Sequence, residues 1–179
     1  LGLPNFQPIF FVVVAVIDER ETYPSNELDF MIPISADEFE ENDSLETANN
    51  LHSEAIVSGT YTQVHSCHEP GDKDFVKFEL AGVNNSISAR TSGSMYSDTY
   101  LTLYNSEGEI IAQNDNVDEV MGDFYSKVDK SGMEPGIYYL ETRANDVSDA
   151  FGSYVLTVTI TSDGVPSADP DDFEEDNTL

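Results

Sequence analysis

The chain has 179 residues, of which 39% are hydrophobic, so it can bury one core of ordinary size and form about one to one and a half domains. Thirty-five acidic residues against seven basic ones give a formal net charge of −28, a field that repels phosphate backbones and anionic lipid headgroups. We therefore expect neither nucleic-acid binding nor membrane insertion. A charge this negative also favours salty surroundings or bound cations, so we expect a secreted or cell-surface protein.

The first 36 residues predict a β-hairpin. The apolar run 9–17 (IFFVVVAVI) is shorter than the roughly 20 residues that span a bilayer, and its Phe and Val content indicates a buried strand. A turn-prone stretch and a second strand candidate at 28–34 (LDFMIPI) follow. Because two strands alone are only marginally stable, we interpret residues 1–36 as the tail of a preceding, immunoglobulin-like β module.

One acidic phrase occurs twice in the chain. Residues 35–45 read SADEFEENDSL, the last residues from Ser167 read SADPDDFEEDNTL, and 134 residues separate Phe39 from Phe173. That spacing is the length of a domain, so the chain is predicted to hold one complete module at 37–162. Residues 163–179 are then a linker and the start of a next repeat.

Between the two copies of the phrase, the sequence predicts an all-β module. An acidic loop from Asp37 is followed by an expected short helical turn at 45–51, with Asp43 or Ser44 as N-cap. Everything downstream has the alternation and turn residues of an antiparallel β-sandwich. The strand candidates are 55–64, 75–80, 86–91, 100–104, 110–113, 137–143 and 154–161.

Five sequence blocks carry a resemblance to a known family. They are DEFEENDSLETA (37–48), PGDKDFVKFEL (70–80), SDTYLTLYNSEGEIIAQND (97–115), PGIYYLETR (135–143) and GSYVLTVTI (152–160). In this order they resemble the bacterial pre-peptidase C-terminal domain, a jelly-roll-like β-sandwich appended to exported proteins. The resemblance implies a non-catalytic accessory module that aids secretion, keeps an attached partner folded or binds an insoluble substrate, as the related collagen-binding domains of clostridial collagenases do.

The acidic loop can supply ligands for a hard cation. Its side-chain oxygens recur at alternating positions, and Ca²⁺ takes six to eight oxygen ligands from a flexible segment. The resemblance to the collagen-binding domains implies a calcium site that also uses carboxylates before the next core strand. The predicted metal ligands are Glu38, Glu40, Asn42, Asp43, Asp72 and Asp74. Without the cation, like-charge repulsion is expected to raise the carboxyl pKa values and loosen the loop; the alternative is that the loop is a solvated acidic linker.

A second acidic loop, 114–119, could form another metal site together with Asp98 and Asp123. Asn and Asp are also ordinary turn formers, and the sequence favours that interpretation.

The stretch His65-Ser66-Cys67-His68 raises the question of zinc or copper. In an extended chain His65 and Cys67 would share one face. Three ligands this close in sequence seldom complete a tetrahedral site, so we predict a surface loop with a free thiol.

No sequence feature supports catalysis or an organic cofactor, since neither a Gly-x-Ser-x-Gly elbow nor a phosphate-cradling glycine loop is present. Exposed tyrosines remain as candidates for stacking on a ligand. These are Tyr96, Tyr100, Tyr104, Tyr125, Tyr138 and Tyr139.

Two functions follow from these patterns. The first is a calcium-stabilised structural or adhesive repeat of a large secreted or cell-surface protein. Its partners would be neighbouring copies or domains of that protein, and its terminal segments could join units into a fibre. The alternative is a substrate-targeting module of a secreted hydrolase, which would bind an insoluble polysaccharide or protein.

Overall fold

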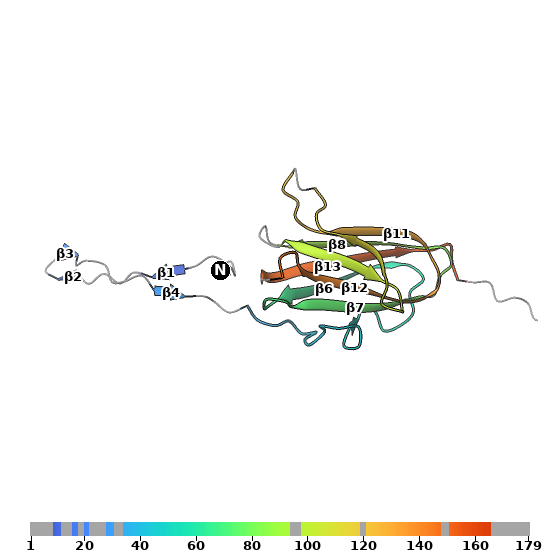
Figure 1. Cartoon of the computed structure of the whole chain (residues 1–179), viewed down its shortest axis with the longest axis horizontal. Coiled ribbons are helices and arrows are strands. Elements are labelled where there is room, and N and C mark those ends of the chain that lie inside the picture. The colour runs from blue at the N-terminus through green and yellow to red at the C-terminus, as the bar shows by residue number, and fades with distance from the viewer. Residues whose placement is uncertain are drawn as a thin grey trace, which may run out of the picture.

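The structure is a computed structural model that describes residues 9–11, 16–17, 20–21, 28–30, 34–93, 98–118, 121–147 and 151–165. Two sheets pack face to face over residues 49–161, which confirms the predicted all-β sandwich (Figure 1). The described residues contain no helix with the length and apolar character needed to cross a bilayer.

The two sheets have five and four strands. In the first, the order is β10 (Ile110–Asn114), β9 (Thr99–Tyr104), β12 (Gly136–Ala144), β7 (Lys73–Leu80) and β5 (Asn49–Asn50). In the second, the order is β11 (Lys127–Met133), β8 (Asn85–Gly93), β13 (Phe151–Thr161) and β6 (Gly59–Cys67). All neighbours are antiparallel except β5, which lies parallel to β7 at the edge of its sheet.

The core forms because alternate side chains of each strand point between the sheets. The predicted alternation is confirmed, with Val76, Phe78 and Leu80 of β7 buried against the other sheet. The other predicted inward positions are also buried, namely Leu101, Leu103, Tyr154, Leu156, Val158 and Ile160.

β6 and β13 pair along the whole length of β6. Cys67, at the end of β6, pairs with Phe151 at the start of β13, and Gly59 at the other end pairs with Ile160. The chain therefore crosses the full length of the second sheet in β13 before leaving it.

Two expectations about local structure are corrected. Residues 45–47 form a turn rather than a helix to residue 51, and β5 occupies Asn49–Asn50 instead. The turn is held by the backbone N–H of Thr47, which donates to the Ser44 carbonyl at 3.2 Å. The strand predicted at 55–64 is broken, since Ile56 makes an isolated bridge to Leu80 and β6 begins only at Gly59.

The leading hairpin is confirmed as a set of short antiparallel ladders. β1 (Ile9–Phe11) pairs with β4 (Leu28–Phe30), and β2 (Val16–Ile17) pairs with β3 (Arg20–Glu21) (Figure 1, blue). These four strands belong to neither sheet of the sandwich. Their assignment to a preceding module stays a prediction, and the start of the predicted next repeat, 166–179, lies outside the described residues.

Candidate metal centre

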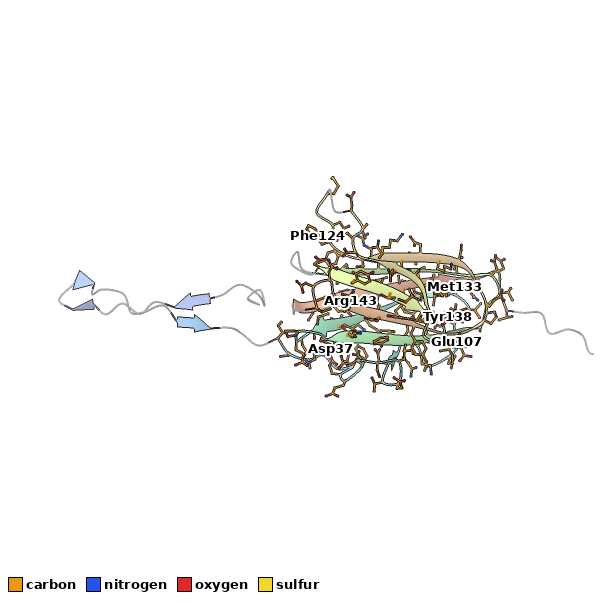
Figure 2. All side chains as sticks on the ribbon, in the orientation of Figure 1. Asp37, Glu107, Phe124, Met133, Tyr138 and Arg143 are labelled. Atoms are coloured by element: carbon orange, nitrogen blue, oxygen red, sulfur yellow. The ribbon has the colours of Figure 1, made fainter. Side chains whose placement is uncertain are left out.

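The acidic segment 37–51 is fixed along the outer edge of the five-stranded sheet by backbone contacts to β7. The N–H of Phe75 donates to the Asn42 carbonyl at 3.0 Å, and the N–H of Leu51 donates to the Lys77 carbonyl at 2.8 Å. This parallel arrangement places the acidic segment beside the first residues of β7. Asp37, where the segment begins, lies towards one end of the sandwich, whereas Glu107 and Tyr138 lie towards the other (Figure 2).

A cluster of three side chains forms where the segment meets the turn before β7. His68 Nδ1 lies 2.7 Å from Asp72 Oδ2 and 3.1 Å from Glu40 Oε1. The side chains of Glu40 and Asp72 are only 8% and 1% exposed, and that of His68 is 24% exposed. Glu40 and Asp72 are predicted ligands that the fold brings together, and His68 joins them. We call Glu40, His68 and Asp72 the Glu40 cluster.

Several buried oxygen atoms at this cluster have no hydrogen-bond partner. They are both carboxylate oxygens of Glu40, Oδ1 of Asp72 and the amide Oδ1 of Asn42. A buried polar atom without a partner costs free energy, and a buried carboxylate costs more, so native proteins pair such groups or coordinate them to metal. The donor set, made mainly of oxygen atoms, fits a divalent cation.

The pKa values of the cluster show the cost of this arrangement without a cation. Burial, reinforced by Asp72 and Asp74, raises the pKa of Glu40 from 4.5 to about 7. Burial also raises the pKa of Asp72. For His68, burial acts to lower the pKa, but the charges of Asp72 and Glu40 outweigh it and raise the pKa. The predicted rise in carboxyl pKa is therefore present, with burial rather than repulsion as its main cause.

These shifts predict that the cation-free protein loses stability between pH 5 and pH 7. A carboxyl group whose pKa is raised by folding holds its proton in the folded state, so stability falls as pH rises from the unfolded value of 4.5 to about 7. The raised pKa of His68 acts in the same direction. Urea unfolding in EDTA at pH 5, 6 and 7 measures the slope, and Glu40→Gln should flatten it; an equal slope in the variant would contradict the assignment.

A second cluster, Asp37, His65 and Asp74, lies next to the first; its carboxylate oxygens have hydrogen-bond donors, whereas His65 Nδ1 is buried without a partner. Asp74 is fully buried and accepts from the hydroxyl of Tyr154 at 2.7 Å and from Asn42 Nδ2 at 3.4 Å. Asp37 accepts from the backbone N–H groups of residues 39 and 66, at 2.8 and 2.7 Å. His65 Nδ1 lies between them, 3.4 Å from Asp74 and 3.7 Å from Asp37. Because each carboxylate oxygen already has a donor, this cluster is a structural polar network.

The stretch from His65 to His68 is not the predicted surface loop. β6 extends through Cys67, so His65 and Cys67 point into the sandwich from one face, as an extended chain requires, and both are fully buried. Ser66 is covered by the incoming chain, since its Oγ donates to the Ser35 carbonyl at 3.0 Å. Burial and Asp74 raise the pKa of the Cys67 thiol, which favours its protonated form.

Two other predicted ligands, Asp43 and Glu38, are exposed. Asp43 is exposed, and its Oδ1 accepts from the backbone N–H of Lys73 at 3.2 Å, one residue from Asp72. Glu38 is exposed in the turn of residues 38–39. The sequence analysis did not include Asp37 among the ligands, and it assigned His65 and His68 to a surface loop because it did not predict that β6 continues to Cys67.

The second acidic loop is organised by hydrogen bonds of its own. Asn114 Oδ1 accepts from the backbone N–H of Lys127 at 2.9 Å, and the Asp115 carbonyl accepts from Ser126 Oγ at 2.8 Å. Asp123 is paired with Arg90 at 2.6 Å. These contacts agree with a turn-forming role, but Asp115 Oδ1 and Asn116 Oδ1 are buried without a hydrogen-bond partner, and a second metal at this loop stays a prediction.

Two of the predicted tyrosines on the outer face of the five-stranded sheet are engaged by their own chain. The guanidinium of Arg143 lies 4.2 Å from the centre of the Tyr100 ring, and the hydroxyl of Tyr104 donates to Glu141 at 2.5 Å. Tyr138 packs against the core instead, and its hydroxyl donates to the Glu134 carbonyl.

Comparison with solved structures gives matches to β domains of similar length to the sandwich. One is the pre-peptidase C-terminal domain of collagenase from Bacillus anthracis, with 21% identity, 62% of this chain and 93% of that chain covered, and a TM-score of 0.44. Another is PliG of Aeromonas hydrophila, a periplasmic inhibitor of g-type lysozyme, with 14% identity, 64% and 96% covered, and a TM-score of 0.45. PliG of Salmonella Typhimurium matches with 18% identity, 64% and 100% covered, and a TM-score of 0.39.

No protein-family model and no curated protein matches the chain. The described module is an all-β sandwich, and its likeness to the pre-peptidase C-terminal domain rests on the five sequence blocks.

Proposed function

We propose that this chain contains a non-catalytic, calcium-stabilised module of a secreted or cell-surface protein. In this proposal Ca²⁺ binds Glu40 and Asp72 and fixes the acidic segment 37–51 against the sandwich. The carrying observation is the set of buried oxygens without partners on Glu40, Asp72 and Asn42. A cation would coordinate those oxygens. It would also make the ionised form of Glu40 more stable than the protonated form at neutral pH.

Calcium is the proposed ion because the surrounding donors are mainly oxygens on irregular chain. Ca²⁺ accepts six to eight such donors in variable geometry, whereas Mg²⁺ demands a near-ideal octahedron. Asn42 and Asp43 lie next to the Glu40 cluster and are the further proposed ligands, with Glu38 the outermost; Asp74, also predicted as a ligand, is held by its own hydrogen bonds and would bind the ion only by exchanging one of them. The net charge of −28 makes cation binding favourable over the whole surface and supports an extracellular setting.

We further propose that the module is a structural or adhesive repeat whose partners are neighbouring copies or domains of its own protein. The recurrence of the acidic phrase after 134 residues supports this proposal, since a second copy of the segment would meet the next module in the same way. A substrate-targeting function has less support, because Tyr100 and Tyr104 are engaged by Arg143 and Glu141.

Limited proteolysis tests the proposed role of calcium. A glutamate-specific protease that needs no calcium should cleave within the acidic segment roughly tenfold more slowly in calcium than in EDTA, because a bound ion lowers the population of the detached segment. Glu40→Gln, which removes a proposed ligand, is the control and should be cleaved at the same rate in calcium and in EDTA. Equal rates at the segment with and without calcium would refute the proposal.

A further inference from the structure

The imidazole of His68 lies within the proposed metal centre. Its Nδ1 is 2.7 Å from Asp72 Oδ2 and 3.1 Å from Glu40 Oε1, at ion-pair distances, and it is buried without a well-formed hydrogen bond. Two atoms bound to one divalent cation at about 2.0–2.4 Å lie roughly 3 Å apart. The two distances from Nδ1 therefore match the edges of a coordination polyhedron, and all three donors lie within 4.8 Å of one another.

A nitrogen donor changes which cations the centre accepts. Ca²⁺ takes oxygen ligands, whereas imidazole suits Zn²⁺ and its first-row neighbours, which also accept carboxylates. We propose that His68 is a metal ligand and that the Glu40 cluster binds Zn²⁺ in competition with Ca²⁺. The inference rests on the proposed function, because both ions would use the carboxylates of Glu40 and Asp72.

The turn before β7 holds His68 and Asp72 in place for a shared ion. The backbone N–H of His68 donates to Asp72 Oδ2 at 2.6 Å, and the N–H of Asp72 donates to the Glu69 carbonyl at 3.2 Å. This closed turn orients the carboxylate towards the imidazole of the residue four positions earlier. Three protein donors leave open positions for water, an arrangement that Zn²⁺ tolerates.

The neighbouring nitrogen and sulfur groups do not offer an alternative zinc site. The thiol of Cys67 is fully buried, with its sulfur 4.0 Å from Asp74 Oδ2, and the carboxylates beside His65 are already hydrogen-bonded. His52 is exposed, and its Nδ1 accepts from the N–H of Glu54 at 3.2 Å. It therefore serves as the matched control.

Zinc titration of the whole chain tests the inference with two measurements. Long-range nitrogen NMR of the three histidines should show Zn²⁺ shifting Nδ1 of His68 and leaving His52 unchanged. Calorimetry should show Zn²⁺ affinity falling about tenfold or more in His68→Gln, while His52→Gln keeps the wild-type affinity. Added Ca²⁺ should weaken Zn²⁺ binding in the wild type.

The outcomes separate this inference from the proposed function. Zinc affinity equal in His68→Gln and wild type, or an unmoved His68 resonance, would overturn the inference even where calcium stabilises the protein. Zinc binding that Glu40→Gln does not weaken would also overturn it, because the ion would lie elsewhere. Zinc binding through His68 without any calcium effect would sustain His68 as a metal ligand, overturn the competition with Ca²⁺ and remove calcium from the proposed function.

Discussion

Calcium added to the metal-free protein at pH 7 should raise its thermal midpoint by about 10 °C, and EDTA should reverse the rise. An ion that binds only the folded state at a free concentration one hundred times its Kd contributes about 2.7 kcal/mol, and each kcal/mol shifts the midpoint of a module this size by roughly 4 °C. The physical source is the set of buried, partnerless oxygens of Glu40 and Asp72. Differential scanning calorimetry in calcium and in EDTA measures the effect.

Substitution of the proposed ligands distinguishes this site from general charge screening. Glu40→Gln should lose most of the calcium-induced rise, and in EDTA it should be at least as stable as the wild type, because the ionised Glu40 is unfavourable there. Asp129→Asn, which removes an exposed acidic group on β11, should keep the full rise. A rise of the same size in all three proteins would show that calcium acts on the net charge and not on the Glu40 cluster.

Asp74→Ala should destabilise the protein by about 3–5 kcal/mol in EDTA, where no metal contribution enters. The Asp74 carboxylate is fully buried and accepts from the hydroxyl of Tyr154 and the amide of Asn42, with the His65 ring 3.4 Å away. Removal of one member of a buried polar network leaves the others without partners in a low-dielectric interior. Urea unfolding followed by tyrosine fluorescence or circular dichroism measures the change.

Two further variants locate the source of that loss. Tyr154→Phe removes only the hydroxyl and should cost less than Asp74→Ala, because the carboxylate keeps the Asn42 donor. Asp129→Ala removes an exposed carboxylate and should change stability by less than about 1 kcal/mol. A cost for Asp74→Ala no larger than that of Asp129→Ala would show that the buried network contributes little.

Much of the sandwich was predictable because apolar and polar side chains alternate along many of its strands. Strands such as β7 and β13 place large apolar residues at every second position, and both were expected from this pattern. β11 was missed because Lys127–Met133 has only two buried apolar side chains, those of Val128 and Met133. It is an edge strand with charged residues, a composition that local pattern does not distinguish from a loop.

The candidate site was predictable in part. Glu40 and Asp72 were expected as ligands from their oxygen chemistry and from the family resemblance, and the fold brings them together. His68 could not be assigned to the site from sequence, because its position depends on β6 continuing through Cys67 and on the turn that follows. In the second cluster, Tyr154 donates a hydrogen bond to Asp74. The two residues are 80 positions apart, so no local sequence pattern reveals this contact.

The register of β6 and β13 has a mechanical consequence for a string of such modules. The incoming chain is attached at Ser66, beside the end of β6 where β13 begins, whereas the outgoing chain passes the start of β6 at the end of β13 and is hydrogen-bonded to Val83 through Asp163 and Gly164. A pulling force between neighbouring modules would then run along the strands and shear their ladder of hydrogen bonds together, rather than peel them apart singly. The proposed ion would sit where that load enters.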